Sequence, residues 1–379
     1  MTRTDIVVVG AGIAGATLAA ELAPHAAVTV IEGEDVAGYH ATGRSAAFWS
    51  ETYGGPQVQP LTTASGAALR EGGYLGGDGA LQIARTDEGA AVAALLADFA
   101  DSGVPLIPVD PRDHVPGLRA GWTLGVLEPS CAFIDVAALH ADALGTARRA
   151  GATVRLGAAL EHAGRAGGRW RVATSEGAFE ADVLVDAAGA WADAVARACG
   201  VMPIGISAYR RTLAQLRTDP APPAGMPLVS HIGGAFYFKP EVGGRLWLSP
   251  HDEIASDPCD AQPEDIDVAM AIDRFEGVVD WRVRALERKW AGLRSFAPDR
   301  LPVYGFDRQA PGFFWCAGQG GFGIQTAPAA ARLAAAVLLG VRPHASVAHI
   351  DPAAYAPARF AANLDQPTTT ESRPWRTSS

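Results

Sequence analysis

The stretch DIVVVGAGIAG, residues 5–15, decides the fold of this 379-residue chain. Its four apolar residues, 6–9, are typical of a strand buried inside a parallel sheet. Gly10 permits a tight turn, and Gly12 lets the backbone approach a pyrophosphate. Gly15 lets the helix that follows pack closely against the strand. The spacing therefore predicts a strand, a glycine-rich turn and a helix that together bind a dinucleotide.

The residues after this stretch complete the pattern. A helix predicted over 13–22 begins with Ile13 and Ala14, and its free N–H groups can bind phosphate. Glu32 follows the next apolar run, 28–31, and lies 17 residues after the last glycine of the motif. A carboxylate there can accept hydrogen bonds from both ribose hydroxyls and repels a 2′-phosphate. These residues predict a Rossmann-like unit and leave NAD and FAD both open.

Composition narrows the class of protein. The chain is 49% hydrophobic and 19% charged, and its length favours two closely packed domains. A formal net charge of −10 argues against a nucleic-acid partner. The four cysteines and nine histidines show no metal-binding spacing, so we expect no metal and a reducing, cytoplasmic location. The apolar run 327–341 is too short to span a bilayer, so we expect no transmembrane segment.

Two further apolar strands also end in glycine. They lie in VDAAGAW, residues 185–191, and in AGQGGFG, residues 317–323, which directly precedes a predicted helix. Ligands of open parallel sheets bind at the carboxyl ends of the strands, so three such ends suit a long ligand such as extended FAD. We therefore favour FAD over NAD. We expect it to bind non-covalently, because Cys316 lies inside a strand and is typical of a small core residue.

The same patterns predict an α/β fold with a discontinuous cofactor domain. Strands of alternating character between the second and third glycine segments indicate an inserted antiparallel sheet that would bind substrate. The expected boundaries are 1–80, 135–203 and 297–366 for the FAD-binding domain, 81–134 and 204–296 for the substrate-binding domain, and 367–379 for a loose tail.

Five long motifs, in this order, resemble the D-amino acid oxidase superfamily of FAD-dependent oxidoreductases, and bacterial FAD-dependent D-arginine dehydrogenases in particular. They are GYHATGRSAA (38–47), VDAAGAW (185–191), FYFKP (236–240), WAGLRSF (290–296) and GQGGFGIQT (318–326). The resemblance covers nearly the whole chain. It implies oxidative deamination of a D-amino acid to the 2-oxo acid and ammonia, by transfer of the Cα hydride to flavin N5.

The resemblance also implies a set of substrate-binding arginines. Arg294 matches the arginine that binds the substrate carboxylate, and Arg211 matches a second one. The neighbouring Arg210 is left open as an alternative. A planar guanidinium suits this task because it binds a carboxylate through two parallel hydrogen bonds and so fixes the direction of the Cα–H bond.

Two tyrosines and a backbone carbonyl complete the implied substrate site. Tyr237 matches a tyrosine that hydrogen-bonds the carboxylate, and strand alternation should turn it away from Phe236 and Phe238. Tyr53 matches a tyrosine of an active-site lid. The carbonyl near Gly321 would accept a hydrogen bond from the substrate amine. We expect no general base, because a neutral amine can lose hydride directly.

Further residues of the motifs are expected at the flavin. They are Gly43, Arg44, Ser45, Ala46, Ala47, Ala188, Gly189, Trp191, Gly320, Gly321, Phe322, Gly323, Ile324, Gln325 and Thr326. His40, in the first of these segments, is more typical of a structural loop histidine.

Two departures from the D-arginine dehydrogenase pattern concern the substrate side chain. Leu81 stands where an acidic residue would bind a guanidinium, and Phe48 replaces a histidine of the same pocket. A cationic side chain would lose its counter-charge there, which costs about 3–5 kcal/mol. We therefore expect a neutral, apolar D-amino acid as substrate.

Other functions stay open. One is oxidation of glycine, sarcosine or another secondary amine on the same fold, and another is a flavin-binding component without turnover of its own. The electron acceptor, oxygen or a quinone, is not specified by the sequence. We expect a monomer or weak oligomer.

Overall fold

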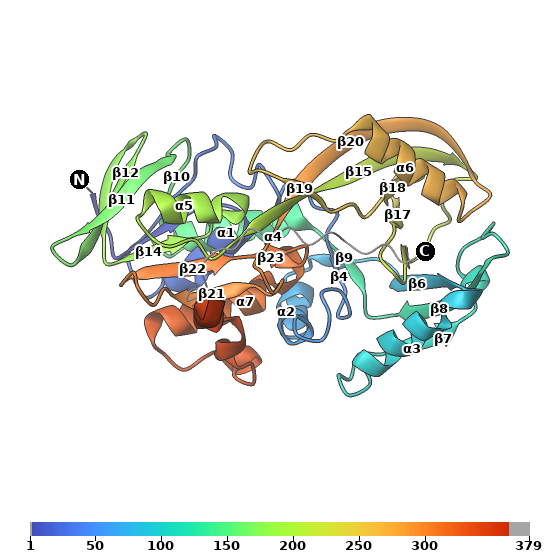
Figure 1. Ribbon diagram of the computed structural model, residues 1–379, viewed down its shortest axis with the longest axis horizontal. Coiled ribbons are helices and arrows are strands. Elements are labelled where there is room, and N and C mark those ends of the chain that lie inside the picture. The colour runs from blue at the N-terminus through green and yellow to red at the C-terminus, as the bar shows by residue number, and fades with distance from the viewer. Residues whose placement is uncertain (1, 364–379) are drawn as a thin grey trace.

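The computed structural model describes residues 2–363, so the expected loose tail lies outside the described residues. A six-stranded sheet forms the centre of one half of the molecule (Figure 1). Five of its strands are parallel, and β21 pairs antiparallel at one edge. In sheet order the strands are β10 (Thr153–Arg155), β3 (Val28–Ile31), β2 (Ile6–Val9), β14 (Val183–Asp186), β22 (Phe313–Ala317) and β21 (Val303–Phe306).

Strand alternation sends the buried residues of this sheet into two separate cores. Val8 of β2 packs with helices on one face, whereas Val7 packs with a second sheet on the other. The helices of the first face are α1 (Ile13–Leu22), α4 (Val136–Arg149) and α7 (Gly323–Leu339). The second face is covered by α5 (Ala192–Ala198) and by β1 (Thr2–Arg3), β13 (Gly177–Ala181), β12 (Arg169–Thr174) and β11 (Leu160–Ala166).

A ten-stranded sheet builds the other half. Its two long antiparallel strands are β15 (Ser207–Asp219) and β20 (Arg282–Phe296), which run from the six-stranded sheet across the molecule (Figure 1). The other strands are β23 (Gln319–Gly320), β18 (Arg245–Ser249), β17 (Tyr237–Glu241), β16 (Leu228–His231), β6 (Ala80–Arg85), β8 (Trp122–Glu128), β7 (Ile107–Val109) and β19 (Ile254–Ser256). Helix α6 (Asp265–Glu276) packs on one face, and α3 (Gly89–Asp98) lies beside β6 and β8.

Short elements join the two halves. Strand β23 pairs with the end of β20, which places the third glycine segment beside Ser295 and Phe296. A small sheet of β4 (Phe48–Trp49), β9 (Ala132–Ile134) and β5 (Leu75–Gly76) lies next to α2 (Gln59–Glu71), which packs on α7. The α/β fold class is confirmed: an open, mostly parallel sheet is combined with a large, predominantly antiparallel one.

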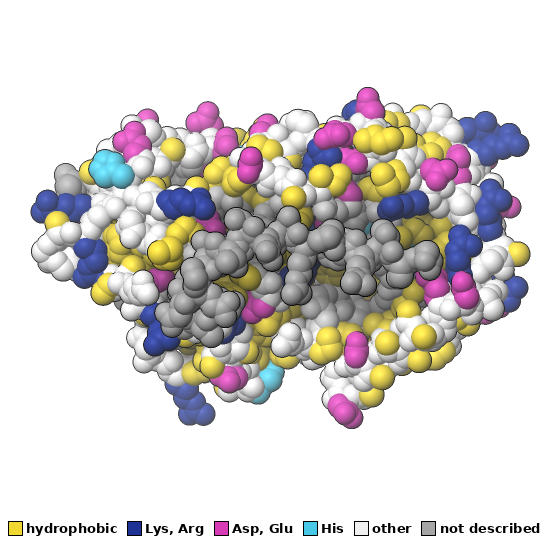
Figure 2. Space-filling view, in the orientation of Figure 1, with side chains coloured by type: hydrophobic (Ala, Val, Ile, Leu, Met, Phe, Trp, Pro, Cys, Tyr) yellow, Lys and Arg dark blue, Asp and Glu magenta, His cyan; other side chains and the backbone are white. Residues whose placement is uncertain are grey.

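The visible face carries mixed charge. Figure 2 shows Lys and Arg side chains interspersed with Asp and Glu, and hydrophobic side chains gathered over α6, where Ile266 and Met270 are exposed. Charges of both signs on one face largely cancel at a distance. Within residues 2–363, no helix combines the length and hydropathy that crossing a membrane requires.

Candidate active site

A single cavity of about 510 Å³ extends between the two halves of the molecule. One end lies at Gly10 and Glu32, beside the carboxyl ends of the parallel strands. The other end is walled by Arg211, Tyr237 and Arg294 of the antiparallel sheet. The cavity therefore connects the predicted nucleotide-binding motif to the predicted substrate-binding residues.

The glycine motif leaves room that side chains would fill. Gly10 has φ +104°, and a Cβ atom there would lie 2.5 Å from the carbonyl oxygen of Ala187. A Cβ atom at Gly15 would overlap the carbonyl oxygen of Gly10, so α1 can pack on β2 only without one. This close approach fits the chain to a dinucleotide whose pyrophosphate lies against the turn.

The adenosine end of the cavity, which is the end beside Gly10 and Glu32 where the adenosine of the dinucleotide would lie, has a fixed carboxylate. Glu32 accepts hydrogen bonds from the backbone N–H groups of Ala11, at 2.7 Å, and Glu34, at 3.1 Å. A carboxylate offers about four lone-pair sites, so it can still accept from ribose hydroxyls. Two residues that sequence reasoning missed support the same turn: His140 Nε2 contacts the Ala11 carbonyl at 2.8 Å, and the Ile13 N–H donates to Thr42 Oγ1 at 3.0 Å. Thr42 lies within the motif 38–47 but was not singled out there, and His140 lies in no pattern that marks it from sequence.

Most of the predicted cofactor residues line this cavity. They are Gly10, Gly12, Ile13, Ala14, Glu32, Arg44, Ser45, Ala46, Ala47, Ala188, Gly189, Trp191, Gly320, Gly321, Gly323, Ile324 and Gln325.

Four predicted cofactor residues lie behind the lining instead. Gly15 and Gly43 allow close backbone packing, since a Cβ at Gly43 would lie 2.8 Å from the Gly38 carbonyl oxygen. Phe322 packs in a small buried cluster, and the hydroxyl of Thr326 donates to the Phe322 carbonyl at 2.8 Å. Because neither side chain reaches the cavity wall, these four residues shape the site from behind rather than facing it.

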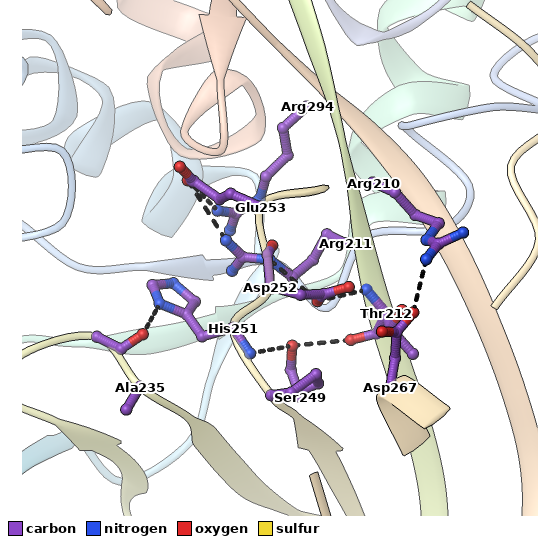
Figure 3. Close-up of polar contacts among 12 residues, drawn as sticks. Arg210, Arg211, Thr212, Ala235, Ser249, His251, Asp252, Glu253, Asp267 and Arg294 are labelled. Carbon is purple, nitrogen blue, oxygen red and sulfur yellow. Dashed lines mark hydrogen bonds and ion pairs between the residues drawn. The ribbon is translucent and has the colours of Figure 1, made fainter. Parts of the chain in front are cut away.

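Two arginines from neighbouring strands meet at the far end of the cavity (Figure 3). Arg211 is only 3% exposed; its Nε donates to the Asp252 carbonyl at 2.6 Å, and its Nη1 has no partner among the described residues. Arg294 Nη2 donates to the hydroxyl of Tyr53. Burial and the nearby Arg294 lower the pKa of Arg211 to about 10, so the group stays cationic at neutral pH. The arrangement can bind an anion.

The neighbouring Arg210 has a different role. Alternation along β15 turns it to the face covered by α6, where it forms ion pairs with Glu264 and, at 2.8 Å, with the buried Asp267 (Figure 3). Its two Nη nitrogens are already paired, and Arg210 does not contribute to the cavity lining of the described residues. Arg210, which the sequence left open as an alternative to Arg211, therefore lies away from the site.

Tyr237 faces the cavity as strand alternation predicts. It clusters with Phe48, at 6.1 Å between ring centroids, whereas Phe236 and Phe238 point into the core beneath α6. Burial raises the pKa of the Tyr237 hydroxyl, which keeps it protonated as a hydrogen-bond donor. The Phe48 ring also lies 5.3 Å from that of Tyr53, so these aromatic rings form an apolar wall beside the arginines.

Gly321 lies directly against these groups. A Cβ atom there would lie 2.7 Å from Cζ of Arg294 and would overlap the Tyr53 hydroxyl. Only glycine therefore lets the third glycine segment approach the arginine end of the cavity this closely.

Leu81 does not lie in the substrate pocket, and that placement is corrected. Its side chain is fully buried in the core on the α6 side of the sheet. The adjacent Gln82 takes the opposite face and donates to Thr52 Oγ1 at 3.3 Å, and Ala80 clusters with Phe48. Neighbouring residues of a strand point to opposite faces of the sheet. A shift of one position in matching Leu81 to the family pattern therefore puts it on the wrong face.

A buried carboxylate missed by the sequence holds the segment before Tyr53. Glu128 is 1% exposed and accepts hydrogen bonds from Ser50 Oγ at 2.9 Å, the Glu51 N–H at 2.6 Å and Thr52 Oγ1 at 2.6 Å. From the other side, Gln325 Nε2 donates to the Tyr53 carbonyl at 2.9 Å. Tyr53 is therefore held beside Arg294 from both directions.

Replacing Glu128 with glutamine should change how stability depends on pH. Burial raises the pKa of Glu128, so the folded state holds this proton more tightly than the unfolded chain. The wild type therefore loses stability relative to Glu128→Gln as pH rises from about 4.3 through the folded pKa. Melting temperatures of both proteins across this range test the sign.

Glu287→Gln is the matched control. Hydrogen bonds from Arg217 and Arg245 lower the pKa of Glu287 to about 2. The wild type should therefore be more stable than Glu287→Gln at neutral pH and should lose that extra stability as pH falls. A pH-independent difference between wild type and Glu128→Gln would contradict the assignment of Glu128.

Residues 2–363 contain no cluster of three or more His, Cys, Asp or Glu side chains suited to a metal ion. Cys316 packs in the core with Tyr304, and burial raises the pKa of its thiol to about 12. His40 contacts Glu34 at 2.8 Å and also lines the cavity.

Comparisons with known proteins agree with this fold. The curated bifunctional protein ThiO/ThiG of Synechocystis sp. is 26% identical over 322 residues, 80% of this chain and 47% of that protein. The chain thus spans about half the length of that relative. Among solved structures, L-proline dehydrogenase from P. horikoshii has a TM-score of 0.83 and 21% identity, over 96% of this chain and 99% of that one. Glycine oxidase from Geobacillus kaustophilus has a TM-score of 0.79 and 22% identity, over 94% and 98%.

A family model described as DAO, FAD dependent oxidoreductase, matches residues 5–337. That span includes the glycine motif at one end of the cavity and the arginine pair at the other. The chain belongs to the DAO family of FAD-dependent oxidoreductases.

Proposed function

We propose that this protein oxidatively deaminates a D-amino acid with a neutral, apolar side chain to the 2-oxo acid and ammonia. The observation that carries the proposal is the buried arginine pair in the cavity wall: Arg211 has an unpartnered Nη1 among the described residues, and Arg294 lies beside it. A buried cationic donor without a partner is costly, and a substrate carboxylate would satisfy it.

The residues around the pair suit an amino acid held in one orientation. The two guanidinium groups would bind the carboxylate, and the hydroxyls of Tyr237 and Tyr53 would donate to it. When bound, FAD supplies the acceptor for the hydride that leaves Cα. The backbone carbonyl near Gly321 would accept a hydrogen bond from the neutral substrate amine. Fixing both ends of the amino acid points Cα–H in one direction, which favours one enantiomer.

The preference for a neutral side chain follows from where acidic groups lie. Among the described residues that line the cavity, the carboxylates are Glu32 and Glu34, both at the adenosine end. Near the arginines the wall is formed by Phe48, Leu213 and the ring of Tyr53. A cationic side chain would find no counter-charge there, and burying it unpaired costs about 3–5 kcal/mol.

An anaerobic screen of the FAD-loaded protein tests the proposal. D- and L-leucine, methionine, phenylalanine and arginine, together with glycine, sarcosine and L-proline, would be mixed with the protein, and loss of flavin absorbance followed. We expect rapid loss with D-leucine, D-methionine or D-phenylalanine, and at least tenfold lower efficiency with D-arginine. Loss with L- but not D-amino acids, or with glycine or sarcosine alone, would overturn it. Admitting oxygen afterwards separates an oxidase from a dehydrogenase.

A further inference from the structure

We infer that Glu253 restricts this site to amino acids that carry a single carboxylate. The inference rests on the proposed function, because it concerns the charge that the arginine pair offers to a substrate. Glu253 follows β18 in the segment leading to β19 and does not itself line the cavity of the described residues. It is therefore a specificity-determining residue that acts through the arginines.

The Glu253 carboxylate lies beside both arginines (Figure 3) and is not part of the cavity lining of the described residues. Its Oε1 lies 3.5 Å from Arg211 Nη2 and 3.7 Å from Arg294 Nη1. Both carboxylate oxygens also accept from Arg300 Nη2, each at 2.9 Å. One carboxylate thus contacts three guanidinium groups, two of which face the cavity.

Counting the charged groups of this cluster gives the charge available to substrate. The cluster holds three guanidinium groups and two carboxylates, from Arg211, Arg294, Arg300, Glu253 and Asp252. The Oδ1 atom of Asp252 lies 3.7 Å from Arg211 Nε. His251 adjoins the same cluster but is neutral at physiological pH. Its pKa is lowered to about 3, mainly because the ring is buried and secondly because Arg211 and Arg294 lie nearby. One positive charge is left over, which a single substrate carboxylate neutralises. A second carboxylate on the substrate would find no unpaired cation.

Glu253 is held too firmly for a second substrate carboxylate to displace it easily. The Asp252 side chain before it accepts the Thr212 N–H at 2.8 Å, and the Asp252 carbonyl accepts from Arg211 at 2.6 Å. On the other side, the Arg300 guanidinium lies 3.9 Å from the centre of the Phe296 ring. The segment is anchored on both sides of the ion pair.

Its backbone is also unusual. Within the described residues, positive φ at a non-glycine occurs at His251, 55°, and Arg300, 67°. These two positions flank the same ion pair. Such conformations persist only where the surrounding contacts determine them, and they concentrate at functional sites.

D-glutamate and D-glutamine test the inference, because they have nearly the same shape and differ in one charge. Wild type should use D-glutamine at least tenfold more efficiently than D-glutamate. In Glu253→Gln the cluster gains one net positive charge, so the D-glutamate to D-glutamine ratio of kcat/KM should rise about tenfold, mainly through KM. The dissociation constants of glutarate and its monoamide, by calorimetry on the FAD-loaded protein, should show the same relative change without turnover.

Two further variants make the result decisive. Glu253→Asp keeps the charge and should keep the wild-type preference, and Glu287→Gln removes a carboxylate that pairs two surface arginines, Arg217 and Arg245, and should change neither ratio. An unchanged ratio in Glu253→Gln, or a wild type that binds glutarate more tightly than the monoamide, would overturn the inference. The glutarate measurement stays informative even if no amino acid reduces the flavin, which would count against the proposed function alone.

Discussion

Arg294→Gln should lower kcat/KM for a neutral D-amino acid by about a hundredfold to a thousandfold, while the bound FAD content stays at the wild-type level. Arg294 lines the cavity and its side chain is 15% exposed, so its bond to a substrate carboxylate would be largely shielded from water. Truncating one partner of such a charge pair costs about 2–5 kcal/mol. Steady-state kinetics with the best substrate of the anaerobic screen measure this loss.

Two further variants test whether the loss of efficiency comes from the carboxylate contact of Arg294. Arg294→Lys keeps the charge but loses the two-pronged geometry, so it should retain an intermediate efficiency. Arg284→Gln removes an exposed arginine from the far end of the same strand, β20, and should be indistinguishable from wild type. If Arg294→Gln keeps kcat/KM within threefold of wild type, Arg294 does not bind the substrate carboxylate.

Gly15→Ala should largely abolish FAD binding. The new Cβ would overlap the Gly10 carbonyl oxygen, and Val8 lies only 3.3 Å from the same point, so α1 must move away from β2. That movement displaces the helix N-terminus from the position where phosphate binds. Overpacking of this kind costs about 1–3 kcal/mol of stability or more, because backbone rather than a flexible side chain has to shift.

The flavin content and melting temperature of the purified variant measure this effect. Gly164→Ala is the control: Gly164 lies in β11, its φ is not in the left-handed region, and a Cβ there would meet nothing within 4 Å. It should bind FAD normally. A Gly15→Ala protein with full flavin content and unchanged melting temperature would contradict the packing argument.

Local patterns were enough to predict the part of the fold that binds the dinucleotide. The unit from β2 through α1 to β3 depends on glycines and apolar residues close in sequence, and it forms where the spacing predicts it. The direction of Tyr237 also followed from alternation within one strand. Such features depend on chain geometry alone.

Features set by distant partners could not be predicted in the same way. Leu81 was placed in the pocket by matching it to a position of the family pattern, whereas the face it takes is fixed by the pairing of β6 with β16 and β8. Arg210 lies away from the cavity because it pairs with Asp267 of α6, a helix distant in sequence. Glu128 and Glu253 likewise contact residues that lie far away in the chain. A buried or clustered carboxylate leaves no periodic mark in the sequence.

The most direct test of the arginine pair as the carboxylate site is a crystal structure of the FAD-loaded protein with 4-methyl-2-oxopentanoate, the 2-oxo acid that D-leucine would yield. We expect its carboxylate oxygens about 3 Å from guanidinium nitrogens of both Arg211 and Arg294. The alkyl chain should lie against Phe48. A ligand whose carboxylate lies elsewhere in the cavity, with the nitrogen Arg211 Nη1 still unpartnered, would contradict the account.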